Sequence, residues 1–415
     1  MAAIKDRYPI NPASLYIHVP FCDGLCDYCD FFSVSVSAGA SCGAVEMDLF
    51  VDAVIGDIED HLAFFEIDEV PSVYVGGGTP SALGAARMER LLSGVRGLLD
   101  PLSGGPAEFT VEANPESADE DFLRVCAAGG VNRISLGVQT FHEDSRRRIG
   151  RTGDPASLAR RLALVADHFP GAFSVDLIAG LPFQTAAVLS QDIKSALEFR
   201  PAHVSLYGLI LEPETTLGRQ VHDKGRRALS LPTEDEADAL WIAGRDMLEK
   251  AGLRQYEVSN FALPGKACAH NIRYWRMQNW IGAGPAASGT IITESEGGPL
   301  KGWRFTYPHD IASYLVAPRP LSHLARVEPL SRDELLRESL LMGFRYRNGP
   351  DPQSFERRFG CSVGDCIPDT IAWWRKRGFF DADFPSGELT LSSKGLLFVN
   401  GFLRDAFAEM DCRNR

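Results

Sequence analysis

Short runs rich in β-branched and aromatic residues recur through the first half of the chain, and longer segments with apolar residues at helical spacing lie between them. A strand followed by a crossover helix, repeated in this way, is typical of parallel βαβ units. We expect helices at 85–99 and 119–129 among the connecting segments. The six expected strands are 14–19, 72–77, 108–113, 132–138, 173–180 and 203–210. Six such units predict an α/β fold in the form of an open or partial barrel.

A doubly wound sheet is the alternative arrangement of the same units. The glycine-rich run after the second strand, GGGTPS at 76–81, lacks the G-x-G-x-x-G spacing that a dinucleotide site needs. The barrel is therefore the preferred prediction.

The pattern changes after about residue 225. We expect a helix at 233–252, because Thr233 and Glu236 have the spacing of a capping box and Gly252 is a helix-ending residue. The aromatic-rich stretch 256–290 that follows has no regular period and is predicted to be irregular.

The last part of the chain, from residue 330, reads as three or four helices with one short hairpin near 387–393. This pattern suits a small, mainly helical, winged-helix-like module. We therefore expect a barrel at 1–225, a barrel extension at 226–320 and a C-terminal module at 321–415.

Composition and charge exclude several classes of protein. Hydrophobic residues make up 45% of the 415 residues and charged residues 23%, as in an ordinary globular protein. The formal net charge of −13 argues against broad binding to nucleic acid or to an anionic membrane, although a local basic patch is compatible with it. The N-terminal residues lack the apolar region of a signal peptide, and no uncharged apolar stretch is long enough to span a membrane. We expect a cytoplasmic protein.

Three of the nine cysteines, Cys22, Cys26 and Cys29, lie within eight residues directly after the first strand. Three thiolates on one loop can hold three corners of a cubane cluster and leave the fourth iron without a protein ligand. Structural zinc normally takes four protein ligands, and His18 lies too far back along the strand to be an obvious fourth. The carboxyl end of a barrel strand is also where active sites lie. We predict an iron–sulfur cluster here.

The other six cysteines are expected to be buried or idle thiols. Two of them could pair, but no further His or Cys lies nearby to complete a second metal site. These six are Cys42, Cys126, Cys268, Cys361, Cys366 and Cys412.

The spacing CxxxCxxC after the first strand and GGGTP after the second resembles the radical S-adenosylmethionine (SAM) enzymes, which have a partial (β/α)6 barrel. Seven motifs then occur in the order and spacing of the group that contains the oxygen-independent coproporphyrinogen III oxidases and the HemW family of heme chaperones. The motifs are YIHVPFCDGLCDYCDFFS, YVGGGTPS, VEANPES, GVQTF, GRTGD, DLIAGLP and LEPETTL. The resemblance implies a [4Fe-4S] cluster on Cys22, Cys26 and Cys29, whose open iron binds SAM and whose electron cleaves it to a 5′-deoxyadenosyl radical.

The resemblance also implies which residues bind one or two SAM molecules. Gly77, Gly78 and Thr79 lack bulk, so that backbone groups can approach a ligand closely. A core tyrosine is the alternative for Tyr16, and a structural salt bridge is the alternative for Asp176, because a buried carboxylate must be paired. The full implied set is Tyr16, Tyr28, Gly77, Gly78, Thr79, Glu112, Gln139, Arg151 and Asp176.

Three features favour the HemW family over the oxidases. The oxidases carry a further cysteine where this chain has Phe31, and they have a longer N-terminal segment than the 15 residues before Tyr16 here. The third feature is HNIRYW at 270–275, which matches the HNxxYW pattern associated with heme binding in HemW-like proteins.

The HNIRYW motif also has a physical interpretation. His270 offers an imidazole to heme iron, and Tyr274 and Trp275 offer flat faces to the macrocycle. Arg273 and Arg276 could neutralise propionates. A buried core histidine is the alternative for His270, and Cys268 is either a thiolate ligand or a spectator.

The resemblance predicts a chaperone that binds heme and delivers it to heme-accepting proteins, supplied by an electron donor and without a nucleic-acid partner. Radical decarboxylation of coproporphyrinogen III, and radical methyl transfer or cyclopropanation, are the enzymatic alternatives. Whether radical catalysis is retained is left open.

Overall fold

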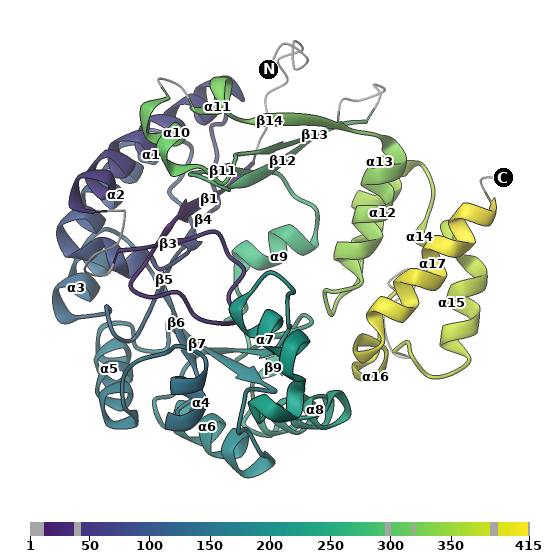
Figure 1. Cartoon of the computed structure of the whole chain (residues 1–415). Coiled ribbons are helices and arrows are strands. Elements are labelled where there is room, and N and C mark those ends of the chain that lie inside the picture. Colours follow the sequence, from purple (N-terminus) through teal and green to yellow (C-terminus); the bar gives the residue numbers. More distant parts are fainter. Residues whose placement is uncertain (1–11, 37–42, 295–299, 318–319, 382–388, 414–415) are drawn as a thin grey trace.

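Six parallel strands, which follow one another in chain order, form the centre of the molecule (Figure 1). The computed structural model describes residues 12–36, 43–294, 300–317, 320–381 and 389–413. Each strand pairs in parallel with the next. The strands are β1 (Ser14–Val19), β4 (Ser72–Gly77), β5 (Glu108–Ala113), β6 (Arg133–Gln139), β7 (Phe173–Ala179) and β8 (His203–Gly208). All six predicted strands are confirmed to within two residues at either end.

The sheet is a partial barrel rather than a doubly wound sheet. The strand order does not reverse, and Figure 1 shows the connecting helices along the outside of the curved sheet. The sheet does not close, because β14 and β9 lie at its two edges. The outer helices are α1 (Ala44–Phe64), α2 (Gly84–Leu99), α3 (Glu120–Ala128), α4 (Glu143–Arg148), α5 (Pro155–His168), α6 (Ala186–Glu198) and α8 (Glu234–Lys250).

Alternation along the strands separates an apolar outer face from a polar inner face. On β1, for example, Leu15, Ile17 and Val19 are fully buried in the main hydrophobic cluster. The residues that alternate with them on β1 point inward and carry polar groups, as do the residues paired with these inner positions on the other strands. The interior of the barrel is therefore polar. These inner residues include Tyr16, His18, Tyr74, Glu112, Ser135, Ser174, Asp176, Ser205 and Tyr207.

The stretch 256–290 is not irregular as predicted. It forms β10 (Asn260–Ala262), α9 (Ala269–Trp275), β11 (Trp280–Ala283) and the start of β12 (Ser288–Thr293). β11 adds in parallel beside β1, and β10 adds antiparallel beside β8, so both complete the edges of the barrel. These strands exist because a sheet edge is available to them, which no local period in the sequence can show.

Two more antiparallel strands, β13 (Lys301–Thr306) and β14 (Arg326–Leu330), extend the sheet beyond β12. The sheet thus reaches past the domain boundary predicted at residue 320, and the helical module begins at α12. The remaining elements near the barrel are β2 (Phe21–Cys22), β3 (Val34–Ser35), η1 (Pro80–Leu83), α7 (Thr216–Lys224), η2 (Arg226–Leu229), β9 (Arg254–Gln255), α10 (Ile311–Val316) and α11 (Pro320–His323).

The C-terminal module is built around a second hydrophobic cluster, which also includes Met277 and Ile292 from the barrel side. Four of its helices have eight residues or more, as predicted, and two are shorter. Part of the predicted hairpin lies outside the described residues; in the described part, Phe380 and Leu391 form an antiparallel bridge. The helices are α12 (Arg332–Gly343), α13 (Pro352–Phe359), α14 (Val363–Cys366), α15 (Pro368–Arg375), α16 (Ser393–Leu397) and α17 (Val399–Arg413). Within the described ranges no helix is long and apolar enough to cross a membrane.

Candidate functional site

The loop that carries Cys22, Cys26 and Cys29 crosses the carboxyl end of the barrel (Figure 1). β2 and β3 pair at its base, and the His18 ring nitrogen Nε2 bonds to the Phe32 carbonyl at 2.9 Å. Its middle is held at Asp27, whose amide donates to the Ile149 carbonyl and whose carbonyl accepts from the Leu217 amide. The loop is therefore held by the protein itself at both ends and at its centre.

The three thiols on this loop are free and partly accessible. Burial, with smaller contributions from the two neighbouring cysteines, raises the pKa of the Cys29 thiol to about 11. In the described part of the chain no three His, Cys, Asp or Glu side chains converge closely enough to hold one metal ion. This observation concerns a single metal ion only. A cubane cluster does not need its ligands to converge, because its thiolates bind separate corners rather than a common point.

The glycine run packs against the base of the cysteine loop. Gly77 has a φ of +110°, and a Cβ there would lie 2.8 Å from the His18 ring. A Cβ on Gly78 would lie 2.5 Å from the Phe21 carbonyl oxygen. The amides of Gly78 and Thr79 donate to the carbonyls of Val19 and Phe21. Glycine is required here by close approach, and the amides of Gly78 and Thr79 are already used within the protein.

A hydrogen-bond network joins Cys22 to the ends of three strands. The Thr79 hydroxyl lies 3.1 Å from the Cys22 sulfur and accepts from the Asn114 amide nitrogen at 3.1 Å. Arg151 donates to the Asn114 side-chain oxygen at 2.9 Å and also bonds to Tyr28. The structure thus brings Cys22, Thr79, Arg151 and Tyr28 together. Asn114 was not predicted, although it lies in the motif VEANPES.

A second unpredicted residue, Arg146, supports the loop that presents Gln139 and Arg151. Its fully buried guanidinium donates to the carbonyls of Val138 and Gly153 and pairs with Glu116 at 2.7 Å. Gln139 ends β6 with a φ of +69°, where the pairing with β7 shifts register. The sequence gives no sign that Arg146 differs from the two arginines that follow it, because only the direction of its side chain in the folded protein sets it apart.

Two predicted carboxylates lie on the inner face of the barrel. Glu112 accepts from the Tyr74 hydroxyl at 2.7 Å, and burial, reinforced by the charge of Asp176, raises the pKa of its carboxyl to about 7. Burial also raises the pKa of Asp176, whose oxygens accept from the hydroxyls of Ser135 and Ser174. Ion pairs to Asp176 are absent from the described residues, so the structure gives no support to a structural salt bridge.

Tyr16 also lies inside the barrel, with its hydroxyl 3.0 Å from His18 Nδ1. Its ring packs beside that of Tyr74. Because this hydroxyl is already bonded to a side chain that positions the cysteine loop, Tyr16 connects the barrel interior to the loop.

The HNIRYW motif lies at the opposite end of the barrel, against the amino ends of the strands. His270 is buried, its Nδ1 bonds to the Ser72 hydroxyl at 3.0 Å, and its Nε2 bonds to the Tyr274 hydroxyl at 2.8 Å. Burial lowers the pKa of His270 to about 3. Both ring nitrogens are thus occupied, and iron ligation by His270 requires α9 to move.

The carboxylate of Glu108, at the start of β5, holds the amino end of α9. It accepts from the amides of Ala269 and His270 at 2.9 Å each and from the Cys268 thiol at 3.2 Å. Cys268 is therefore a buried hydrogen-bonding thiol in this arrangement. Trp275 packs toward the C-terminal module, and its indole nitrogen is buried without a partner in the described residues.

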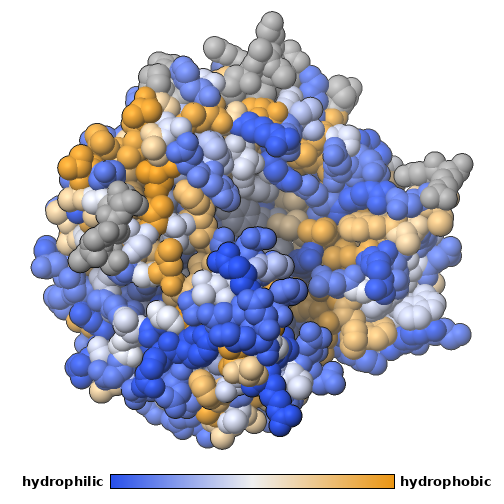
Figure 2. Space-filling model, in the orientation of Figure 1, coloured by the Kyte–Doolittle hydropathy of each residue, from blue (hydrophilic) through white to orange (hydrophobic). Residues whose placement is uncertain are grey.

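Figure 2 shows a hollow between the barrel and the C-terminal module. Large apolar side chains are exposed on segments at the carboxyl ends of the strands: Leu25 (56% exposed), Phe31 (68%) and Ile210 (70%). Phe31 faces solvent. This end of the molecule combines free thiols, a polar interior and an apolar rim.

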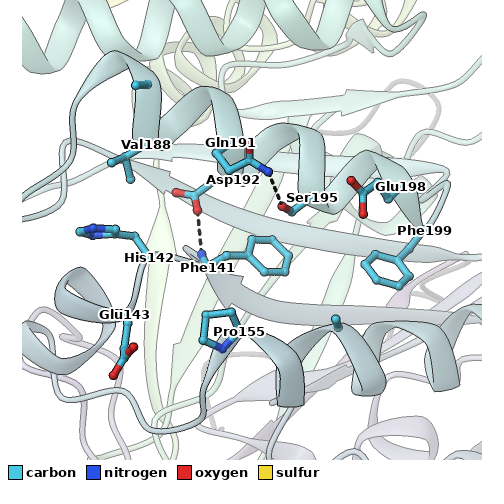
Figure 3. A pocket seen from close by; sticks show the side chains of 12 residues that line it. Phe141, His142, Glu143, Pro155, Val188, Gln191, Asp192, Ser195, Glu198 and Phe199 are labelled. Carbon is cyan, nitrogen blue, oxygen red and sulfur yellow. Dashed lines mark hydrogen bonds between the residues drawn. The ribbon is translucent and has the colours of Figure 1, made fainter.

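A separate cavity of about 580 Å³ lies outside the barrel between α5 and α6 (Figure 3). Phe141, Pro155, Val188 and Phe199 give it an apolar wall. Asp192 accepts from the Phe141 amide and the Thr140 hydroxyl, both at 2.7 Å, and so anchors the segment after Gln139. The cavity contains none of the predicted site residues.

Of the remaining cysteines, Cys42 lies outside the described residues, Cys126 and Cys268 are buried, and Cys412 is exposed. The sulfurs of Cys361 and Cys366 are 3.5 Å apart at the ends of a short segment that contains α14.

Comparison with known proteins identifies the family. A model of the radical SAM superfamily matches residues 16–196. The chain is 36% identical to the heme chaperone HemW of Lactococcus lactis over 352 residues, which are 85% of this chain and 86% of that protein. It is 38% identical to the heme chaperone HemW of Escherichia coli over 68% of this chain and 71% of that protein.

The chain belongs to the HemW family. The structure of HemN, the radical SAM coproporphyrinogen III oxidase of Escherichia coli, matches with a TM-score of 0.77 and 22% identity over 96% of this chain and 91% of that one. This likeness confirms the predicted fold class, and HemW membership confirms the predicted family.

Proposed function

We propose that this chain is a heme chaperone that carries a [4Fe-4S] cluster and SAM, binds heme and delivers it to acceptor proteins. The observation that carries the proposal is the fixed loop of three free thiols at the carboxyl end of the barrel, in a chain of the HemW family. A cytoplasmic location, an electron donor and heme-accepting partners belong to the same proposal. The division into barrel, barrel extension and C-terminal module also belongs to it, with the last boundary moved to the end of β14.

The residues present fit a cubane cluster. Cys22, Cys26 and Cys29 supply soft thiolate ligands to three corners, and Gly78 leaves no side chain between the loop base and the strand ends. When bound, such a cluster supplies one electron and an open coordination position for SAM. The protein's own contribution is to hold the thiols in place and to keep the neighbouring barrel interior polar.

The barrel interior fits SAM. The carbonyl oxygens of Gly77 and Gly78 and the carboxylate of Glu112 are acceptors that suit an ammonium group or ribose hydroxyls. Asp176, Gln139, Arg151, Tyr28 and Tyr16 lie on the same inner face or at its carboxyl edge. We propose these residues, with Thr79, as the SAM-binding set.

Heme binding through His270, Tyr274 and Trp275 stays a prediction, and it requires α9 to leave Ser72 and Glu108. Heme titration into the wild type and into His270→Ala tests it, with Ile272→Ala, at a variable position of the HNxxYW pattern, as the neighbouring control on the same helix. A weakened Soret band in His270→Ala alone supports ligation by His270. Unchanged spectra and affinity would remove His270 from the heme site.

Assay of coproporphyrinogen III conversion under anaerobic, reducing conditions separates the chaperone from the oxidase. We expect no turnover, because Phe31 replaces the further cysteine of the oxidases. Transfer of heme from the loaded protein to an apo-cytochrome is the matching positive assay. Robust turnover without heme transfer would refute the proposed function.

A further inference from the structure

Four side chains from four different segments form a continuous chain of hydrogen bonds that ends on Cys22. Arg151 Nη1 lies 2.9 Å from Asn114 Oδ1. Asn114 Nδ2 lies 3.1 Å from Thr79 Oγ1, which lies 3.1 Å from the Cys22 sulfur. We call these four residues the Arg151–Cys22 relay.

The chemistry of arginine fixes the direction of every bond in the relay. A guanidinium can only donate, so the Asn114 oxygen must face Arg151 and the Asn114 nitrogen must face Thr79. Thr79 Oγ1 therefore accepts from Asn114, and its own proton is free for another partner. The Cys22 thiol directs its single proton at the Gly24 carbonyl, 3.0 Å away. The Thr79 hydroxyl is thus the donor to the Cys22 sulfur.

The surroundings hold the relay in this arrangement. Thr79 is only 3% exposed, so water competes little for its hydroxyl. The Asn114 amide donates to the Ser81 hydroxyl at 3.1 Å, and the Asn114 carbonyl accepts from the Ala118 amide. Arg151 also donates to the Gly137 carbonyl at 2.9 Å. Each member is therefore positioned by a contact outside the relay.

We propose that the relay tunes the cluster: Thr79, oriented by Asn114 and Arg151, donates a hydrogen bond to the Cys22 sulfur and raises the reduction potential of the cluster held there. Hydrogen bonds to the sulfurs of an iron–sulfur cluster stabilise its more negative, reduced state. Thr79 and Asn114 are positioning residues in this role. The inference rests on the proposed function, because it requires the cluster.

The test is the midpoint potential of the cluster, measured by redox titration with electron paramagnetic resonance on anaerobic protein without SAM. Thr79→Val removes the donor and is expected to shift the midpoint to more negative values, whereas Thr79→Ser keeps it. Thr110→Val is the matched control, because the buried Thr110 hydroxyl on β5 has no partner in the described residues.

Asn114→Asp tests the orientation of the relay with almost no change in size. The new carboxylate can only accept, so the Thr79 hydroxyl turns toward it and the Cys22 sulfur loses its donor. We expect a negative shift in this variant as well. Pulsed measurements should detect an exchangeable proton near the cluster in the wild type and in Thr110→Val, and not in Thr79→Val.

A failure of the relay can be told apart from a failure of the proposed function. A full cluster in Thr79→Val with the midpoint and the exchangeable proton of the wild type would overturn the relay and leave the proposed function standing. A wild type that binds no cluster would overturn both. Should Thr79→Val fail to fold, an Asn114→Asp variant with full iron and the wild-type midpoint overturns the relay in its place.

Discussion

Removal of the Glu108 carboxylate is the sharpest perturbation of the HNIRYW motif. Glu108 accepts from the amides of Ala269 and His270 at 2.9 Å each. In Glu108→Ala the buried His270 amide loses its acceptor at about 1–3 kcal/mol, whereas the partly buried Ala269 amide can be rescued in part by water. Together with the Cys268 thiol, which loses the same acceptor, this should destabilise the packed position of α9 by about 2–4 kcal/mol.

Hydrogen exchange over residues 268–276 measures this change. A loss of 2 kcal/mol or more corresponds to a roughly 30-fold or larger fall in protection, because about 1.4 kcal/mol is a factor of ten. Glu108→Gln keeps one acceptor oxygen and should fall between Glu108→Ala and the wild type. Glu120→Ala, on the exposed surface of α3, is the control and should leave α9 unchanged.

The same variant tests the link between this helix and heme. If His270 binds heme iron only after α9 opens, Glu108→Ala should bind heme faster than the wild type. Unchanged exchange in Glu108→Ala would refute the role of Glu108 as the anchor of α9. Faster exchange with slower or absent heme binding would place heme elsewhere on the molecule.

Two further predictions concern the barrel and the loop base. Burial raises the pKa of the folded Glu112 carboxyl to about 7, so its contribution to stability is complete below about pH 4.5 and is lost as pH rises through 7. When the pH is raised from about 4.5 to 8, the melting temperature should therefore fall less in Glu112→Gln than in the wild type. Affinity for SAM should rise with pH through 7 in the wild type and stay flat in Glu112→Gln, by calorimetry. Gly78→Ala should cost about 1–3 kcal/mol and lower cluster occupancy. Gly97→Ala, inside α2 with open space at its Cβ, should instead stabilise by up to about 1 kcal/mol in chemical denaturation.

The sequence alone predicted the parts of the fold and the site that follow from the periodicity of apolar residues and the spacing of motifs. The alternation of residues such as Leu15, Ile17 and Val19 marks buried strands, and the spacing of the cysteines and glycines places them at strand ends. The edge strands β10 and β11 were not predictable, because they form only where β8 and β1 present free edges.

The sequence does not show in which direction a side chain points after folding. Asn114 and Arg146 matter because of what their side chains face after folding, and nothing distinguishes them from neighbouring polar residues in the chain. His270 shows the converse: its chemistry suits heme iron, yet the fold turns both of its nitrogens onto Ser72 and Tyr274.

Iron content tests the central claim most directly. Anaerobically purified wild type should contain about four irons per chain and show the absorbance of a [4Fe-4S] centre. Alanine at Cys22, Cys26 or Cys29 should abolish both, while Cys412→Ala, at an exposed thiol on α17, should keep both. Full iron in the three loop variants, or none in the wild type, would contradict the account.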